Sequence, residues 1–202
     1  MMDLSVQQFS SDQWFSSDMQ FHYLYPQSVQ QYARRHWTPL DVACKAADFL
    51  AAEKGVRVLD IGSGVGKFCL SAAYYKPDAF FYGIEQRKDS IAYAETAKEI
   101  LQLPNVYFIH GNFTQLNLRF YDHFYFYNSF YENLAGTNKI DDSIAYSVEL
   151  YNYYNRYLFN QLERMPSGTR LSTFHSLEHE VPPGYHVVGS EMDNLLKYWI
   201  KE

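Results

Sequence analysis

The sequence predicts an α/β fold in which a mostly parallel sheet carries helices on both faces. Between residues 56 and 175, short apolar segments rich in β-branched and aromatic residues alternate with longer helix-like segments, a pattern typical of parallel sheets. The strand predicted at 56–61 also runs directly into a glycine-rich turn and a helix. Ligands in such sheets bind beyond the carboxyl ends of the strands. We therefore expect a ligand site after the first strand.

Local signals predict the individual elements. Thr38 is a capping residue and Pro39 suits the first helical position, so a helix is expected to start there and to stop at Gly55. Strands are expected at 56–61, 79–85, 105–111, 123–127 and 169–175, and helices at about 66–75, 88–103 and 141–165. Segments 185–190 and 195–202 are typical of a closing pair of strands. The chain thus divides into an N-terminal aromatic segment, residues 1–37, and a domain of residues 38–202.

Composition restricts the function classes. The 202 residues are 47% hydrophobic and 20% charged, as in an ordinary globular protein with one sizeable core. A net charge of −6 argues against a broad nucleic-acid surface or an anionic-membrane surface. No apolar run reaches the ~18 residues of a membrane helix, and no signal peptide is evident. Cys44 and Cys69 are too few for a disulfide framework and are interpreted as reduced core thiols, which predicts a cytoplasmic location.

The turn after the first strand, 62–66, has glycine at alternate positions. Glycine permits positive φ and lets a ligand approach the backbone closely. Glu85 ends the second strand, 21 positions after Gly64, where a carboxylate can accept both hydroxyls of a ribose. A dinucleotide site would need a third glycine where Lys67 stands. Asp60, inside the first strand, can orient a cationic amino group, so the predicted ligand carries an amine and no bulky pyrophosphate.

The stretches "VLDIGSGVG" and "YGIE" resemble motif I and the acidic loop of class I S-adenosylmethionine-dependent methyltransferases. The resemblance covers roughly residues 38–202. It implies a Rossmann-like, seven-stranded sheet with an antiparallel last strand, and S-adenosyl-L-methionine as cofactor. In the family, the turn holds the methionine moiety and the acid holds the ribose. Carried over, these roles fall on Asp60, Gly62, Ser63, Gly64, Gly66 and Glu85.

Two further strand ends carry family roles. After the third strand, Asn112 stands where family members often have Asp, and its carbonyl could accept from the adenine amino group. Phe113 is expected either to lie against the adenine ring or to belong to the core. After the fourth strand, residues 128–131 have the outline of the N-P-P-Y loop of amino-group methyltransferases, with both prolines replaced. A closer parallel is the N-N-F loop of the non-SET histone-lysine methyltransferases of the telomeric-silencing type.

The resemblance therefore implies a methyltransferase that acts on an amine, with a protein side chain or a small molecule as the acceptor. Asn128 is expected to hold the acceptor and to border the cofactor. Tyr131 and Glu132 are expected to complete the catalytic pocket, with Glu132 accepting a proton from a charged amine. In the alternative without a catalytic role, Tyr131 is a packed ring and Glu132 is a solvated loop carboxylate. The competing functions are a non-catalytic cofactor-binding partner module and a small-molecule O-methyltransferase.

Two remaining features concern metals and the N-terminal segment. None of the seven histidines has metal-ligand spacing, and the pair Asp141-Asp142 is interpreted as the cap of the long helix, so no metal site is expected. The aromatic residues of segment 1–37 are expected to fold over the carboxyl ends of the strands as a lid that excludes water. The alternatives are plain packing on the domain or a dimer contact.

Overall fold

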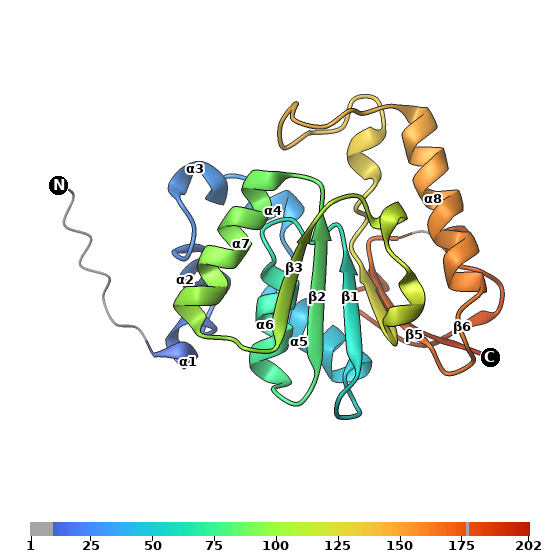
Figure 1. The fold of residues 1–202 in the computed structure, drawn as a ribbon, viewed down its shortest axis with the longest axis horizontal. Coiled ribbons are helices and arrows are strands. Elements are labelled where there is room, and N and C mark those ends of the chain that lie inside the picture. The colour runs from blue at the N-terminus through green and yellow to red at the C-terminus, as the bar shows by residue number, and fades with distance from the viewer. Residues whose placement is uncertain (1–9, 177) are drawn as a thin grey trace.

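Seven strands form one sheet in the order β3-β2-β1-β4-β5-β7-β6. The computed structural model describes residues 10–176 and 178–202 (Figure 1). The strands are β1 (Arg57–Ile61), β2 (Phe80–Glu85), β3 (Val106–His110), β4 (His123–Phe126), β5 (Arg170–Phe174), β6 (Tyr185–Glu191) and β7 (Leu196–Lys201). Strands β1 to β5 pair in parallel, and β7 is antiparallel to both β5 and β6. The predicted α/β class and the antiparallel last strand are confirmed.

Helices cover both faces of the sheet. On one face lie α5 (Leu40–Leu50), α6 (Lys67–Tyr75) and α7 (Lys88–Leu101), whose apolar sides pack with Phe81 and Tyr125 of the sheet. On the other face lies α8 (Val148–Glu163), which packs over Phe124 and Leu171. The remaining connections contain the short 3-10 turns Phe113–Gln115, Leu118–Phe120, Tyr131–Asn133 and Glu178–Glu180. Because strand side chains alternate between faces, each face builds its own core.

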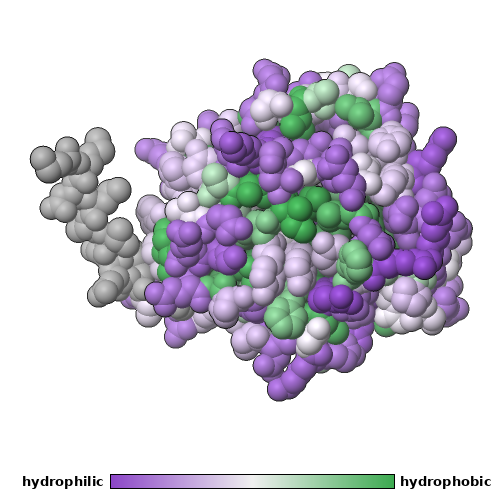
Figure 2. All heavy atoms as spheres, in the orientation of Figure 1, coloured by the Kyte–Doolittle hydropathy of each residue, from purple (hydrophilic) through white to green (hydrophobic). Residues whose placement is uncertain are grey.

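The face of β1 to β3 that α8 does not reach exposes apolar side chains. Phe80, Tyr107 and Phe120 are each 40% or more exposed, and Tyr82 stacks on Tyr107 with ring centroids 5.0 Å apart. Figure 2 shows a band of apolar residues across the middle of the molecule. None of the helices in the described part of the chain has the length and apolar character needed to cross a bilayer.

The described part of the N-terminal segment packs beside the glycine turn. Its helices α1 (Ser11–Trp14), α2 (Asp18–His22), α3 (Gln27–Gln30) and α4 (Ala33–His36) share a core with α5, α6 and α7. Phe15 stacks on Tyr74 of α6 with ring centroids 4.0 Å apart. The Tyr25 hydroxyl donates to the Val65 carbonyl at 3.0 Å. The predicted lid also includes residues 1–9, which lie outside the described residues.

Two predicted helix starts are wrong. Helix α5 begins after Pro39, and the Asp18 carboxylate, not Thr38, accepts from the Leu40 amide at 3.0 Å. Thr38 instead lies 3.1 Å from the Tyr125 hydroxyl, a tertiary contact that outweighs its capping preference. Helix α8 begins at Val148, capped by Ser147. The Asp141 carboxylate accepts from the Ser143 amide at 2.9 Å, so it forms a local turn in the preceding loop instead of a helix cap.

The two cysteines are free, as expected, but only one is a core thiol. Cys69 is fully buried on α6. Cys44 is partly exposed on α5, so its interpretation as a core residue is wrong. Its position follows from the helical period, which places Ala43 and Ala47 at the sheet and turns Cys44 toward the edge of that contact.

A buried amide anchors the end of α6 to the sheet. The Asn105 side chain precedes β3 and donates to the carbonyls of Ala73, Lys76 and Ala79 at 2.9–3.2 Å. These carbonyls belong to the last turn of α6 and the loop after it, where no helical N–H remains to pair with them. Asn105 therefore fixes the geometry with which α6 returns to β2.

Replacing Asn105 with Ala is expected to lower the free energy of unfolding by about 1–3 kcal/mol, since buried carbonyls lose their donors. Urea denaturation measures the change. Asn152→Ala, at an exposed position on α8, is the matched control and should stay within about 0.5 kcal/mol of the wild type. Equal stability of the two variants would contradict the anchoring role.

Candidate active site

A cavity of about 490 Å³ lies at the carboxyl ends of β1, β2 and β4. It is placed where β1 has β2 on one side and β4 on the other, so that the connections leave in opposite directions. Residues 35–38, from the end of α4 to the segment before α5, form another part of its wall. The N-terminal segment and the sheet thus contribute to one site.

The glycine turn between β1 and α6 is tightly packed. Gly62 has a φ of 78°, and a Cβ there would lie 2.5 Å from the Ser129 Cβ, so no other residue fits without a shift. The amides of Gly62 and Ser63 both donate to the Ile84 carbonyl at 3.0 Å. Ser63 lines the cavity, and its buried hydroxyl has no hydrogen-bond partner among the described residues. The turn therefore presents unpaired polar groups to a ligand.

Asp60 lies at the floor of the cavity. Burial raises the pKa of its carboxyl, the Cys69 thiol at 3.7 Å lowers it and the nearby Glu85 raises it, and together these effects bring the pKa to about 8. The acid is therefore mainly protonated at neutral pH. A cation placed against it would favour the ionised form and reverse this shift.

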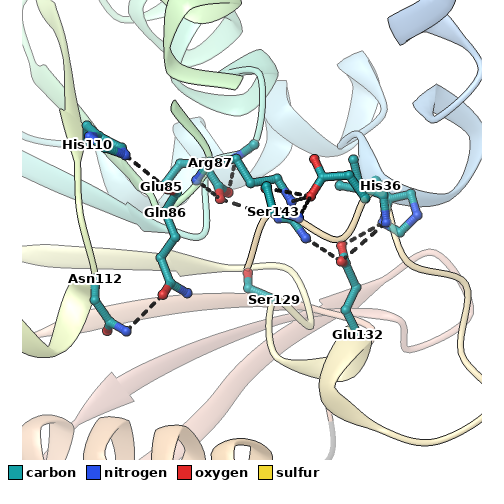
Figure 3. Close-up of polar contacts among 12 residues, drawn as sticks. His36, Glu85, Gln86, Arg87, His110, Asn112, Ser129, Glu132 and Ser143 are labelled. Carbon is teal, nitrogen blue, oxygen red and sulfur yellow. Dashed lines mark hydrogen bonds and ion pairs between the residues drawn. The ribbon is translucent and has the colours of Figure 1, made fainter. Parts of the chain in front are cut away.

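Glu85 holds the end of β2 against the glycine turn. One carboxylate oxygen accepts from the Gly64 amide at 3.1 Å, and the other accepts from the Arg87 amide at 2.9 Å. The Arg87 guanidinium then bridges to Glu132 at 2.5 Å and to the Tyr146 hydroxyl at 2.7 Å (Figure 3). Burial opposes its charge, but Glu85 and Glu132 outweigh that effect and raise the pKa of Arg87 above its usual value.

The loop after β4 brings the expected acceptor residues to the same cavity. Asn128 has a φ of 41°, a left-handed conformation that Asn tolerates better than most residues. The Ser129 hydroxyl donates to the Ile61 carbonyl at 2.5 Å and pins the loop to β1. Tyr131 is 51% exposed, and the Glu132 side chain is only 15% exposed. Tyr131 is therefore not a packed ring, and Glu132 is not a solvated carboxylate.

Asn112 and Phe113 lie beside this cavity without lining it. The Asn112 amide donates to the Gln86 side chain at 3.0 Å and to the Tyr154 hydroxyl at 2.9 Å. Phe113 stacks on Phe130 with ring centroids 5.1 Å apart, and it borders a second, small cavity of about 40 Å³. The structure therefore brings together the residues predicted at the ends of β1, β2 and β4. The adenine roles of Asn112 and Phe113 stay predictions.

Three site residues were not found by sequence reasoning. Lys67 lines the cavity, is 3% exposed and pairs with Asp18 of α2. Burial lowers the pKa of Lys67 against the effect of Asp18. A lysine in the first turn of an apolar helix was a usable signal for it. Arg87 and His36 were missed because each faces Glu132, which lies 45 or more residues away in the sequence.

Within the described ranges, no group of three or more His, Cys, Asp and Glu side chains is arranged to hold a metal ion.

Comparison with known proteins agrees with this geometry. Residues 52–141 match the family model described as "Methyltransferase domain". Nearly half of the chain, including the glycine turn and Glu85, is therefore similar to a methyltransferase domain. Over 67 residues it is 38% identical to the release factor glutamine methyltransferase of Buchnera aphidicola, covering 33% of this chain and 24% of that protein. Over 54 residues it is 43% identical to a tRNA (guanine-N(7)-)-methyltransferase of Synechococcus, covering 27% and 23%. The domain's matches thus span about a quarter of the length of these curated relatives.

Solved structures share the domain's fold. The magnesium protoporphyrin IX methyltransferase of Synechocystis, solved with bound SAM, superposes with a TM-score of 0.59 at 16% identity and covers 95% of both chains. An RNA methyltransferase of Salinibacter ruber, in complex with S-adenosyl-L-homocysteine, gives a TM-score of 0.53 at 20% identity over 81% of this chain and 92% of that chain. At these identities the likeness establishes the sheet order and the helices around it.

The raised pKa of Asp60 predicts how stability depends on pH. A carboxyl whose pKa rises from 3.8 to about 8 on folding keeps a proton that the unfolded chain has released. Between these values, its contribution to stability is therefore lost as pH rises. We expect Asp60→Asn to become more stable relative to the wild type between pH 5 and pH 8.

Urea denaturation at pH 5, 6.5 and 8 measures this difference. Asp89→Asn, at an exposed position in the first turn of α7, controls for the loss of one carboxylate. A stability difference between Asp60→Asn and the wild type that does not vary with pH would show that Asp60 is ionised in the folded chain.

Proposed function

We propose that the chain is an enzyme that transfers a methyl group from S-adenosyl-L-methionine to a nitrogen of an amine acceptor. One observation carries the proposal. A single cavity is bordered on one side by the glycine turn, Asp60 and Glu85, and on another side by Asn128 and Tyr131. The first group has the chemistry that an amino-acid and ribose ligand requires, and the second can hold an acceptor.

The residues present fit this cofactor. The Asp60 carboxyl can face the amino group, and Glu85 can exchange its bond to the Gly64 amide for the ribose hydroxyls. The buried Ser63 hydroxyl, which lacks a partner among the described residues, is available for a further contact. The bound cofactor supplies an electrophilic methyl group on a sulfonium. The protein then needs to place the acceptor in line and keep its nitrogen unprotonated.

The acceptor side supports nitrogen chemistry. The Asn128 side-chain oxygen can accept from an N–H and aim the nitrogen lone pair. Around it, Arg35, Glu132 and Asn138 add charged and amide groups to a cavity wall that also contains Trp37, Phe68 and Tyr127. Its open volume supports turnover over a non-catalytic binding module, for which a filled acceptor pocket is expected.

Two likenesses support the same acceptor. The loop 128–131 resembles the N-N-F loop of telomeric-silencing type enzymes, which methylate lysine nitrogen. The name of one curated relative specifies guanine N(7), another nitrogen.

The cofactor prediction is tested by calorimetry with S-adenosylhomocysteine and NAD. S-adenosylhomocysteine is expected to bind and NAD is not. Glu85→Ala should weaken S-adenosylhomocysteine binding by about 1–3 kcal/mol, the scale of hydrogen bonds to a charged acceptor. Glu99→Ala, at an exposed position on α7, should leave the affinity unchanged. Tight NAD binding without S-adenosylhomocysteine binding would overturn the proposed function.

The acceptor prediction concerns Asn128. Asn128→Ala should lower methyl transfer by roughly 100-fold or more, because a mispositioned acceptor loses in-line geometry. The assay supplies labelled S-adenosylmethionine to a cell lysate that is then separated into protein, nucleic-acid and small-molecule fractions. Mass spectrometry of the labelled product identifies the methylated atom. Equal losses of transfer and of S-adenosylhomocysteine affinity would move Asn128 to the cofactor side, and methylated oxygen would refute the nitrogen acceptor.

A further inference from the structure

His36, at the end of α4, lies in the wall of the cavity against Glu132. Its Nδ1 is 3.4 Å from a Glu132 carboxylate oxygen, and only 17% of its side chain is exposed. Figure 3 shows His36 and Arg87 approaching Glu132 from opposite sides. A carboxylate beside Nδ1 favours the neutral tautomer that carries its proton on Nδ1, and this tautomer leaves the Nε2 lone pair free. Nε2 has no hydrogen-bond partner among the described residues.

Contacts around His36 place it close to the acceptor loop. The Tyr127 hydroxyl donates to the Arg35 carbonyl at 3.3 Å, which ties the residue before His36 to the residue before Asn128. Glu132 is itself held by Arg87 and by the Tyr146 hydroxyl at 3.1 Å. The carboxylate beside the His36 ring therefore cannot turn away without breaking its buried ion pair with Arg87.

The groups that face His36 favour its neutral form. Burial lowers the pKa of His36 below 6.5, Glu132 raises it, and Arg87 and Arg35 lower it. The Tyr32 ring of α4 lies edge-on at 6.3 Å and adds no charge. A neutral imidazole at pH 7 is able to accept a proton. Glu132 is less suited to that role, because its carboxylate is already paired with the buried Arg87 guanidinium.

The geometry points to His36 as the general base of the methyl transfer, with Glu132 as the residue that positions it; this inference rests on the proposed function. His36 Nε2 takes the proton from the acceptor nitrogen as that nitrogen bonds to the methyl carbon. The carbon–sulfur bond breaks and leaves its electron pair on sulfur. The proton then leaves from the partly exposed ring to solvent. The acceptor is thereby restricted to a group that carries a removable N–H proton.

A first test needs neither cofactor nor acceptor. In protein labelled with [15N]histidine, a long-range proton–nitrogen correlation spectrum reports the tautomer and titration of each ring, and His36→Asn assigns the His36 signals. We expect His36 to be neutral at pH 7.5 with its proton on Nδ1. In Glu132→Gln, its titration midpoint should fall, since the carboxylate stabilises the imidazolium. A protonated ring at pH 7.5, or a proton on Nε2, would overturn the inference.

A second test uses the acceptor fraction found by the labelled-methyl assay. His36→Asn should lower the transfer rate by about 100-fold or more, the scale of general base catalysis, and should remove the loss of rate at acid pH. Its affinity for S-adenosylhomocysteine should stay within about threefold of the wild type, since binding of that product needs no base. His186→Asn removes an exposed histidine that also faces a carboxylate, Glu202 at 3.2 Å, and should change neither quantity.

The outcomes separate the two proposals. Wild-type binding and transfer, together with a His36→Asn variant that transfers at the wild-type rate, would refute the role of His36 and leave the proposed function standing. A wild-type protein that neither binds S-adenosylhomocysteine nor transfers methyl groups would refute the proposed function. The NMR result on the tautomer stands in either case, because it is measured on the protein alone.

Discussion

The arrangement of the site depends on one buried cation. The Arg87 guanidinium joins the end of β2, the loop after β4 and the loop that precedes α8, through Glu85, Glu132 and Tyr146. A buried charge is costly unless it is paired. Moving any one of these segments away would therefore leave a buried charge without its partner. The ion pairs are thus a geometric constraint as much as a source of stability. They fix the distance between Glu85 and the loop after β4.

The N-terminal segment is constrained in a similar way. Asp18 accepts from the first amide of α5 and pairs with Lys67 at the start of α6. One carboxylate thereby connects α2 to the beginning of two core helices. Trp37 and Thr38 lie between α4 and α5 and line the cavity. The position of the N-terminal segment therefore determines the shape of this part of the cavity wall. Helices of four or five residues have little stability of their own, so this order comes from tertiary contacts.

Features with a local cause could be predicted from the sequence. The alternation of strands and helices, the turn at Gly62 and the acid at Glu85 follow from periodicity and backbone sterics within a few residues. They were sufficient to predict the α/β class and the place of the cavity, while the antiparallel last strand was implied by the resemblance to methyltransferases. The helix starts at Leu40 and Val148 could not be predicted, because the distant Asp18 carboxylate caps the first helix and Asp141 forms a local turn before the second. His36 and Arg87 belong to the same class, since burial and ion pairing across the fold give them their character.

The small cavity beside Phe113 shares Arg87 and Glu132 with the large one, so the ion pair between them serves as a partition. A ligand that extends through both volumes must find this partition open. Its measured affinity is then the intrinsic affinity reduced by the fraction of molecules in which the partition has opened. Binding becomes a two-step process whose slower step belongs to the protein. Ligand shape alone would therefore be a poor guide to affinity, and shorter ligands confined to the large cavity would associate without that delay.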